Sequence, residues 1–208
     1  MISSSYSCIS LVSSTPINIE QCYKSGELYF YNEPIDIKSS QTEIKWTSKS
    51  DTDFWQRTHY GFRRDTGHCL FMKKSGDFTL QSHVHYVPAN QYDQAGLIVY
   101  YDSEHWVKTS AEGEVDEPFN LGSVVTDDGF SDWATQPFTE QIVDLEFKIM
   151  RQGQDFLVYY RSYGSEKWIQ LRMGHLSIPI DCEMQVGIYS CSPITGGFES
   201  TFDNFICC

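Results

Sequence analysis

Positive charge is scarce in this chain. Its 208 residues include 15 Lys and Arg against 28 Asp and Glu, which gives a formal net charge of −13. The longest basic runs are the pairs Arg63-Arg64 and Lys73-Lys74, so no local cluster reverses that field. A polyanion is repelled by such a charge. We therefore expect neither nucleic acid nor an anionic membrane surface as a partner.

Long apolar runs and cysteine motifs are also missing. No stretch approaches the length of a membrane span, and the serine-broken start has no Lys or Arg before Lys24, unlike a secretory signal. The 7 cysteines are scattered and form no C-x-x-C pair, which favours neither a disulfide framework nor a zinc ribbon. No glycine loop of the kind that holds phosphate occurs, and we expect no cofactor. These absences indicate a cytoplasmic protein.

Period-two alternation dominates from Gly26 onward, and no helix-period segment of useful length accompanies it. The clearest segments run from Ile142 to Arg151 and from Phe78 to Tyr86, each with one apolar and one polar face. Glycine and aspartate punctuate the alternating runs where hairpin turns are expected. Ten further segments are predicted as strands, at residues 27–31, 43–47, 69–73, 94–101, 106–112, 121–126, 155–161, 167–172, 183–189 and 198–206.

So many strands without helices predict an all-β protein, because that number does not fit one open sheet. The economical arrangement is a two-sheet antiparallel sandwich of the jelly-roll kind. We find no linker within it. The expected organisation is a single sandwich domain at residues 26–208, preceded by a polar segment, residues 1–25, that is either mobile or packed on the sandwich.

One predicted hairpin offers a candidate binding face. Alternation in its two strands, residues 94–101 and 106–112, places one set of side chains on a plausible core face and a mostly polar or aromatic set on the other. The core-face set is Ala95, Leu97, Val99, Val107, Thr109 and Ala111. An aromatic plate beside a cation, a carboxylate and an amide suits recognition of a sugar or a peptide, although a solvated outer face would look the same. The face carries Gln94, Ile98, Tyr100, Trp106, Lys108, Ser110 and Glu112. Elsewhere Trp55, Tyr60, Trp133 and Tyr189 have polar neighbours, and they either stack on sugar rings or pack in the core or at its rim.

Two further patterns predict alternative chemistries. Glu112, Glu114 and Asp116 share one side if the strand extends that far, and paired carboxylates facing a cleft are what glycoside hydrolysis needs. The alternative without catalysis is that these residues form a solvated acidic end of the strand. His83 and His85 share a face of another strand, a spacing that can hold a metal ion or leave two surface histidines.

Several motifs in order resemble the regulation-of-enolase protein family, which belongs to the concanavalin A-like lectin/glucanase superfamily. They are the segments Thr52 to Phe62, Gly76 to Thr79, Tyr92 to Leu97, Trp106 to Glu112, Ser123 to Thr126 and Ser131 to Trp133. The ending, from Val186 to Pro193 and on to Phe205, also resembles the accessory sandwich domain of β-xylosidases. The resemblance runs from about Gly26 to Phe205, nearly the whole predicted domain.

The resemblance implies two curved antiparallel sheets, with a ligand on the concave one, and a regulator of a glycolytic enzyme rather than a catalyst. The family motifs place the site at Trp55, Tyr60, Gln94, Trp106, Lys108, Glu112, Thr126 and Trp133. Our leading hypothesis is a non-catalytic cytosolic protein that recognises a carbohydrate or a metabolic enzyme, enolase being the partner that the resemblance suggests. The competing hypothesis is a glycoside hydrolase that uses two of the carboxylates named above.

Overall fold

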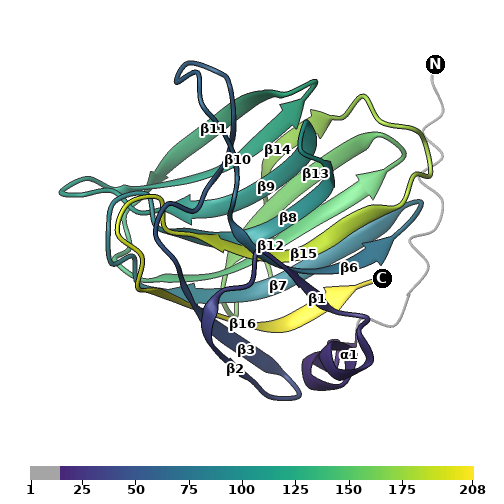
Figure 1. The fold of residues 1–208 in the computed structure, drawn as a ribbon, viewed down its shortest axis with the longest axis horizontal. Coiled ribbons are helices and arrows are strands. Elements are labelled where there is room, and N and C mark those ends of the chain that lie inside the picture. The colour runs from purple at the N-terminus through teal and green to yellow at the C-terminus, as the bar shows by residue number, and fades with distance from the viewer. Residues whose placement is uncertain (1–14) are drawn as a thin grey trace.

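Two seven-stranded antiparallel sheets make up most of the protein (Figure 1). The computed structural model describes residues 15–208. The first sheet has the order β1-β6-β15-β8-β9-β10-β11. Its strands are β1 (Tyr29–Tyr31), β6 (His68–Lys74), β15 (Met184–Cys191), β8 (Gln94–Asp102), β9 (His105–Glu112), β10 (Phe119–Asp127) and β11 (Phe130–Phe138).

The second sheet lies against the first and has the order β14-β13-β12-β7-β16-β3-β2. Its strands are β14 (Ile169–His175), β13 (Asp155–Ser162), β12 (Val143–Gln152), β7 (Phe78–Tyr86), β16 (Phe198–Cys207), β3 (Glu43–Ser48) and β2 (Ile35–Ser39). A separate two-stranded sheet joins β4 (Phe54–Gln56) to β5 (Arg63–Asp65). The predicted all-β sandwich is therefore confirmed.

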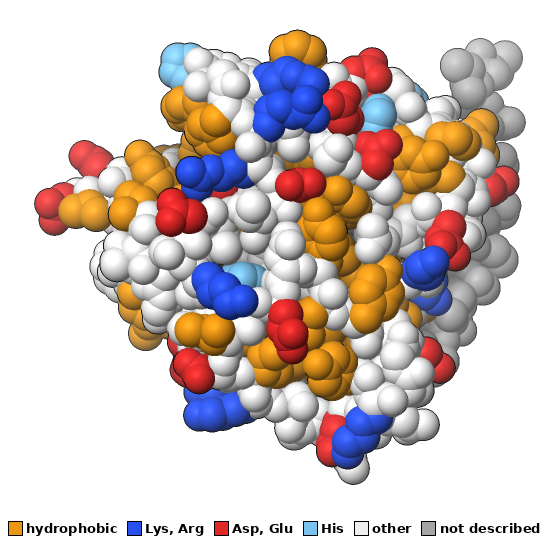
Figure 2. Space-filling model, in the orientation of Figure 1, with side chains coloured by type: hydrophobic (Ala, Val, Ile, Leu, Met, Phe, Trp, Pro, Cys, Tyr) orange, Lys and Arg blue, Asp and Glu red, His pale blue; other side chains and the backbone are white. Residues whose placement is uncertain are grey.

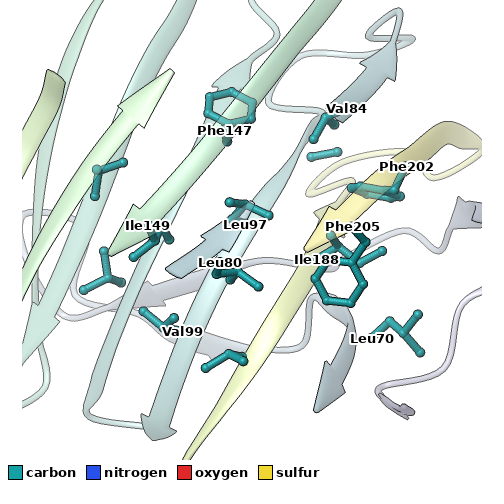
Figure 3. Packing of buried hydrophobic residues seen from close by; sticks show 14 of the residues in the cluster. Leu70, Leu80, Val84, Leu97, Val99, Phe147, Ile149, Ile188, Phe202 and Phe205 are labelled. Carbon is teal, nitrogen blue, oxygen red and sulfur yellow. The ribbon is translucent and has the colours of Figure 1, made fainter. Parts of the chain in front are cut away.

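The core lies between the two large sheets, where the inward side chains of both meet (Figure 3). Leu97 and Val99 of β8 face Leu80 of β7 and Ile149 of β12, and all four side chains are fully buried. These residues are members of the alternating runs, so period two in the sequence becomes one apolar face per strand.

Four strands were not predicted from the sequence. β4 and β5 have three residues each, too few for an alternation to be seen. β2 and β11 each form one edge of their sheet, and neither shows regular burial. An edge strand needs no alternating apolar face, and β11 even contains Pro137, which a central strand rarely tolerates.

A short helix is also present where none was predicted. α1 (Ile19–Ser25) begins at Asn18, whose side chain accepts a hydrogen bond from the Gln21 amide, and ends at Gly26 in the left-handed conformation. Ile19 is fully buried in the core, and the Ile17 amide donates to the Phe205 carbonyl. Residues 15–25 thus pack on the sandwich, while the start of the predicted polar segment lies outside the described residues.

The surface mixes both signs of charge. Figure 2 shows basic side chains scattered singly among acidic and hydrophobic ones on the face turned to the viewer, without a continuous basic patch there. In the described part of the chain, no helix has the length and apolar character needed to cross a membrane.

Candidate functional site

A cavity of about 550 Å³ opens on the outer face of the first sheet, the face turned away from the core. Strands β8, β9, β10 and β11 supply its floor and one side, and the segment from Asp53 to Arg64 forms the opposite wall. This volume lies within the range of small-molecule sites. The even-numbered side chains of the predicted hairpin face this cavity side, as their alternation predicts.

Gln94 organises the floor because its amide group uses every hydrogen-bonding position. Its Oε1 accepts from the Lys108 ammonium at 2.9 Å and from the Tyr189 hydroxyl at 3.1 Å. Its Nε2 donates to Glu112 Oε2 at 2.6 Å and to the Tyr92 carbonyl at 3.3 Å. Gln94 and Glu112 are direct cross-strand partners in the β8–β9 pairing, which explains this contact. A fully bonded amide holds the ammonium and the carboxyl group in fixed places.

Lys108 is the buried cation of the floor, with only 5% of its side chain exposed. Its Nζ lies 3.7 Å from Asp53 Oδ1 and about 6 Å from the ring centres of Trp106 and Tyr189, at 5.9 and 5.7 Å. A buried ammonium is tolerated when it is paired and lies over aromatic faces. One N–H reaches Gln94, so the ammonium keeps donors for a ligand.

Glu112 is the second unusual group of the floor. Burial raises its pKa to about 8 and the negative charges of Asp53 and Glu114 add to the rise, whereas Lys108 and the hydrogen bond from Gln94 oppose it. Glu112 therefore carries a proton at neutral pH and acts as a donor through the oxygen that Gln94 does not contact. That oxygen has no hydrogen-bond partner among residues 15–208.

Aromatic side chains form the walls. On one side the Trp55 ring meets Tyr60 edge-on at 5.5 Å, and Tyr60 stacks on Phe62 at 5.9 Å. On the other side stands Trp133 of β11. Gly122 makes room for it, because a Cβ at that position would lie 3.0 Å from Trp133 Nε1 and 2.4 Å from the Ala134 carbonyl oxygen.

Six of the predicted site residues line the cavity, namely Trp55, Tyr60, Gln94, Lys108, Glu112 and Trp133. Tyr100, Trp106 and Thr126 do not, and each is at least 94% buried. Phe54 covers two of them, with ring centres 6.3 Å from Tyr100 and 5.8 Å from Trp106. These three positions pack beneath β4 and β5, and the expectation that they face the cavity is corrected.

The three carboxylates of the acidic run, Glu112, Glu114 and Asp116, do not lie on one side of a strand. β9 ends at Glu112, so the strand does not extend to Asp116, which is exposed in a left-handed bend. Glu114 still reaches the cavity, where its two oxygens accept from Gln91 at 3.0 Å and from Asn120 at 2.8 Å. The predicted alignment of three carboxylates is therefore wrong for Asp116.

The histidine pair lies far from this cavity, on the outer face of the second sheet. His83 contacts Asp203 at 2.9 Å and Asp144 at 2.8 Å through its two ring nitrogens, and it stacks on Tyr163. His85 lies 3.3 Å from the same Asp144 oxygen. Within residues 15–208, no three His, Cys, Asp or Glu side chains gather so that they could hold a metal ion.

Sequence reasoning missed several lining residues. Asp53, Phe62 and Arg64 sit on the wall, and Ile194 follows β15. Phe62 lies within the motif from Thr52 to Phe62, but nothing in the local sequence pattern indicates that it lines a binding site. Asp53 reaches Lys108 only because β4 folds over the first sheet, a contact between distant segments that alternation does not reveal.

Comparison with known proteins adds the family. The family model described as "Protein of unknown function (DUF1349)" matches residues 30–207. Regulation of enolase protein 1 of Saccharomyces cerevisiae is 31% identical over 174 residues, which are 84% of this chain and 85% of that protein.

Solved structures agree with the fold. A functionally unknown protein from Saccharomyces cerevisiae superposes with a TM-score of 0.81 at 28% identity, covering 88% of this chain and 96% of the other. A xylan β-1,4-xylosidase from Bacillus halodurans gives 0.61 at 14% identity, covering 87% and 38%. The carbohydrate binding module CBM66 of Bacillus subtilis gives 0.56 at 12% identity, covering 87% and 94%. Because the family model spans most of the sequence, the chain belongs to the DUF1349 family and is related to yeast Regulation of enolase protein 1.

Proposed function

We propose that the cavity binds a carbohydrate without transforming it. The observation that supports this most strongly is the cavity floor, where hydrogen bonds connect Lys108, Gln94 and Glu112, together with the aromatic side chains on the walls. A sugar ring presents C–H faces that stack on aromatic rings, together with hydroxyl groups that both donate and accept hydrogen bonds. The walls and the floor supply these two kinds of contact.

The charges of the floor favour a neutral ligand with several hydroxyl groups. Lys108 donates, Asp53 accepts, and protonated Glu112 donates. An anionic ligand would meet the Asp53 and Glu114 carboxylates, and a cationic one would meet Lys108. The carbohydrate binding module with the same fold is consistent with this choice.

Titration calorimetry with glucose, xylose, fructose and their short oligosaccharides tests the proposal. Lys108→Met keeps the length of the side chain and removes its donors, so we expect at least about a tenfold loss of affinity for the sugar that the wild type binds. Lys45→Met is the matched control, because Lys45 pairs with Glu199 on the second sheet at 2.8 Å. Absence of binding to every sugar, or equal binding by Lys108→Met, contradicts the proposal.

Hydrolysis is the alternative use of the same cavity. It needs one protonated and one ionised carboxyl group, the second acting as nucleophile or base. Glu112 meets the first condition. Of the other two carboxylates in the cavity, Glu114 accepts from amide donors through both oxygens, and Asp53 Oδ1 accepts from the Phe54 amide at 2.8 Å and lies 3.7 Å from the Lys108 ammonium. We therefore expect oligosaccharides to be recovered intact after long incubation. Release of reducing ends that Glu112→Gln abolishes would overturn the non-catalytic assignment.

A second candidate function is binding of an enolase. The name of the 31% identical yeast relative suggests it, and the mouth of the cavity exposes Tyr60, Phe62 and Ile194 at 58%, 41% and 51%. Exposed apolar groups around a hollow are typical of protein contacts. We expect Tyr60→Ala with Phe62→Ala to weaken binding to purified enolase in surface plasmon resonance, whereas Ile180→Ala, exposed elsewhere, leaves it unchanged. No binding of enolase by the wild type contradicts this candidate.

A further inference from the structure

The cavity wall formed by residues 54–65, called the wall segment below, belongs to neither large sheet. β4 and β5 pair over three residues only, and a two-stranded hairpin of that length is not stable alone. Trp55, Tyr60, Phe62 and Arg64 of this segment line the cavity. Its position therefore depends on contacts with the rest of the protein.

At its base the wall segment is attached to β11 by a hydrogen bond from a backbone amide to a side chain. The Gln56 amide donates to the Ser131 hydroxyl of β11 at 2.8 Å. Beyond this point the loop is closed on itself, because the Arg57 amide donates to the Phe62 carbonyl and the Gly61 amide to the Arg57 carbonyl, both at 2.7 to 2.8 Å. These bonds shape the loop but do not attach its tip to the sandwich.

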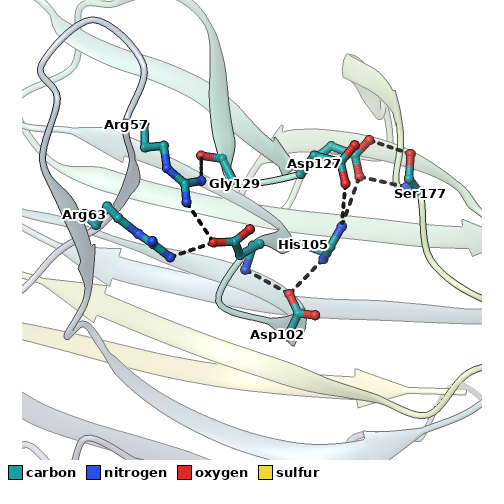
Figure 4. Close-up of polar contacts among 9 residues, drawn as sticks. Arg57, Arg63, Asp102, His105, Asp127, Gly129 and Ser177 are labelled. Atoms are coloured by element: carbon teal, nitrogen blue, oxygen red, sulfur yellow. Dashed lines mark hydrogen bonds and ion pairs between the residues drawn. The ribbon is translucent and has the colours of Figure 1, made fainter.

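The tip is attached by side chains that reach two turns of the first sheet (Figure 4). Arg57 donates through Nη2 to Glu104 Oε1 at 3.0 Å and through Nη1 to the Gly129 carbonyl at 2.8 Å. Arg63 donates to the same Glu104 oxygen at 2.6 Å. The ring of Phe130 lies 5.5 Å from the Arg57 guanidinium.

The two turns are themselves joined. The Gly129 amide donates to the Glu104 carbonyl at 3.0 Å, so Glu104 binds the neighbouring turn through its backbone and the wall segment through its carboxylate. A Cβ at Gly129 would lie 1.8 Å from Arg57 Nη1, so a side chain at this position would displace the guanidinium. Its φ of +73° also favours glycine.

We propose that Arg57 and Glu104 are positioning residues that hold the aromatic wall at the spacing that stacks on the ligand. They do so from outside the cavity, since neither lines it. The inference rests on the proposed carbohydrate function. Arg57 and Glu104 are about one third exposed, at 32% and 36%, so salt screens their attraction. A neutral sugar should then bind less tightly at high salt, although it carries no charge itself.

The first test uses two glycine substitutions with the same backbone cost. Gly129→Ala displaces Arg57, whereas Gly153→Ala at φ +63° meets nothing within 4 Å. We expect hydrogen exchange at the Arg57 and Gly61 amides to speed up about tenfold in Gly129→Ala only. We also expect the affinity for the sugar selected by the wild type to fall about three- to tenfold.

The second test removes charge without changing shape. Glu104→Gln should weaken sugar binding and abolish its salt dependence between 0.02 and 0.5 M NaCl, settings chosen to span about 20 to 4 Å of screening length. Glu199→Gln, which breaks an exposed ion pair on the second sheet, should leave both unchanged. A role limited to overall stability would not change the salt dependence of a neutral ligand.

Equal exchange in Gly129→Ala and Gly153→Ala overturns the attachment, whatever the sugar data show. Faster exchange with unchanged affinity overturns the positioning role. If the wild type binds none of the sugars, the proposed function is contradicted. The hydrogen-exchange comparison of the two glycine variants then tests by itself whether Arg57 and Glu104 attach the wall segment.

Discussion

Glu112 shows how one residue sets the chemistry of the cavity. Its neighbour Gln94 is neutral, and the Lys108 ammonium that would favour ionisation is already paired with Asp53. Burial therefore prevails and raises the pKa of Glu112 to about 8. A glutamate that stays protonated at neutral pH can donate a hydrogen bond to a sugar hydroxyl, which an ionised carboxylate cannot do.

The raised pKa predicts a pH-dependent stability. In the unfolded chain Glu112 ionises near 4.5, whereas in the folded protein it holds its proton to about 8. The contribution of Glu112 to the free energy of unfolding is therefore fully present below pH 4.5 and is lost as the pH rises to 8, by up to about 1.4 kcal/mol per pH unit. Glu112→Gln keeps the neutral shape and the bond from Gln94, so its melting temperature should vary less between pH 5 and 9 and exceed that of the wild type at pH 9.

Sugar affinity should depend on the protonation of Glu112. We expect the wild-type affinity to fall above pH 8, while Glu112→Gln, whose amide still donates, binds equally from pH 6 to 9 by calorimetry. Glu114→Gln serves as control, because it changes the charge at another carboxylate of the cavity and keeps Glu112, so the affinity should still fall as the pH rises. An affinity that rises with pH in the wild type would show that the ionised form binds.

Gly122 is the second residue-scale case. Any side chain there meets the Ala134 carbonyl at 2.4 Å and the Trp133 indole nitrogen at 3.0 Å. Gly122→Ala should therefore push β11 outward, lower the unfolding free energy by about 1 to 3 kcal/mol in urea titration, and alter sugar affinity through Trp133. Gly26→Ala, where φ is +80° and the space is open, controls for stability alone. Unchanged stability would show that β11 adapts freely.

At the scale of elements, alternation predicted every central strand of the two large sheets but only two of their four edge strands, β1 and β14. Residues 78–86 were placed correctly as β7 because each face of that strand has one kind of neighbour. β2 and β11 were missed because solvent accepts any polar sequence on an outer strand. The site followed the same rule. The alternation of even- and odd-numbered residues predicted that Lys108 lies on the cavity side. It did not reveal that Phe54 covers Trp106, because the covering segment comes from elsewhere in the chain.

The turn elements beside the wall segment carry a pH-dependent contact of their own. His105 lies 2.8 Å from Asp102 and 3.4 Å from Asp128, with Asp127 at 4.0 Å (Figure 4). Burial alone would lower the pKa of His105, but these carboxylates outweigh it and raise the pKa above its usual value. Both ring nitrogens face acceptors, so the protonated ring joins the two turns.

A raised histidine pKa stabilises the folded state fully below the unfolded value of 6.5 and loses that contribution as the pH rises through the folded value. His105→Asn should therefore lower the melting temperature at pH 5.5 more than at pH 8.5. His175→Asn is the control, since His175 pairs with one exposed aspartate, Asp155, at 2.7 Å. An equal loss at both pH values would mean that the neutral ring makes the contact. Because Glu112 shifts in the same direction, the comparison is best made in a Glu112→Gln background.

At the scale of the whole molecule, the first sheet separates two apolar clusters. The larger lies between the sheets and includes Phe147, and the smaller lies under the wall segment and includes Phe54. Both rings are fully buried. The two clusters differ in what holds them: the first has a complete sheet on either side, while the second is covered by the short β4 and β5 and the loops around them.

This difference predicts unequal consequences for the same substitution. Phe147→Ala leaves a cavity that neither sheet can close, so the unfolding free energy should fall by about 3 to 5 kcal/mol in urea titration. Phe54→Ala removes the ring that touches Tyr100, Trp106 and Tyr189. We expect the wall segment to detach locally while the sandwich stays folded, and the cost to global stability is then limited to the free energy that docks this segment. We therefore expect a smaller loss in urea, fast hydrogen exchange confined to residues 54–65, and no sugar binding. If Phe54→Ala destabilises the whole protein as much as Phe147→Ala, with exchange accelerated in both sheets, the wall segment is part of the cooperative core, and binding at the cavity depends on the stability of the entire sandwich.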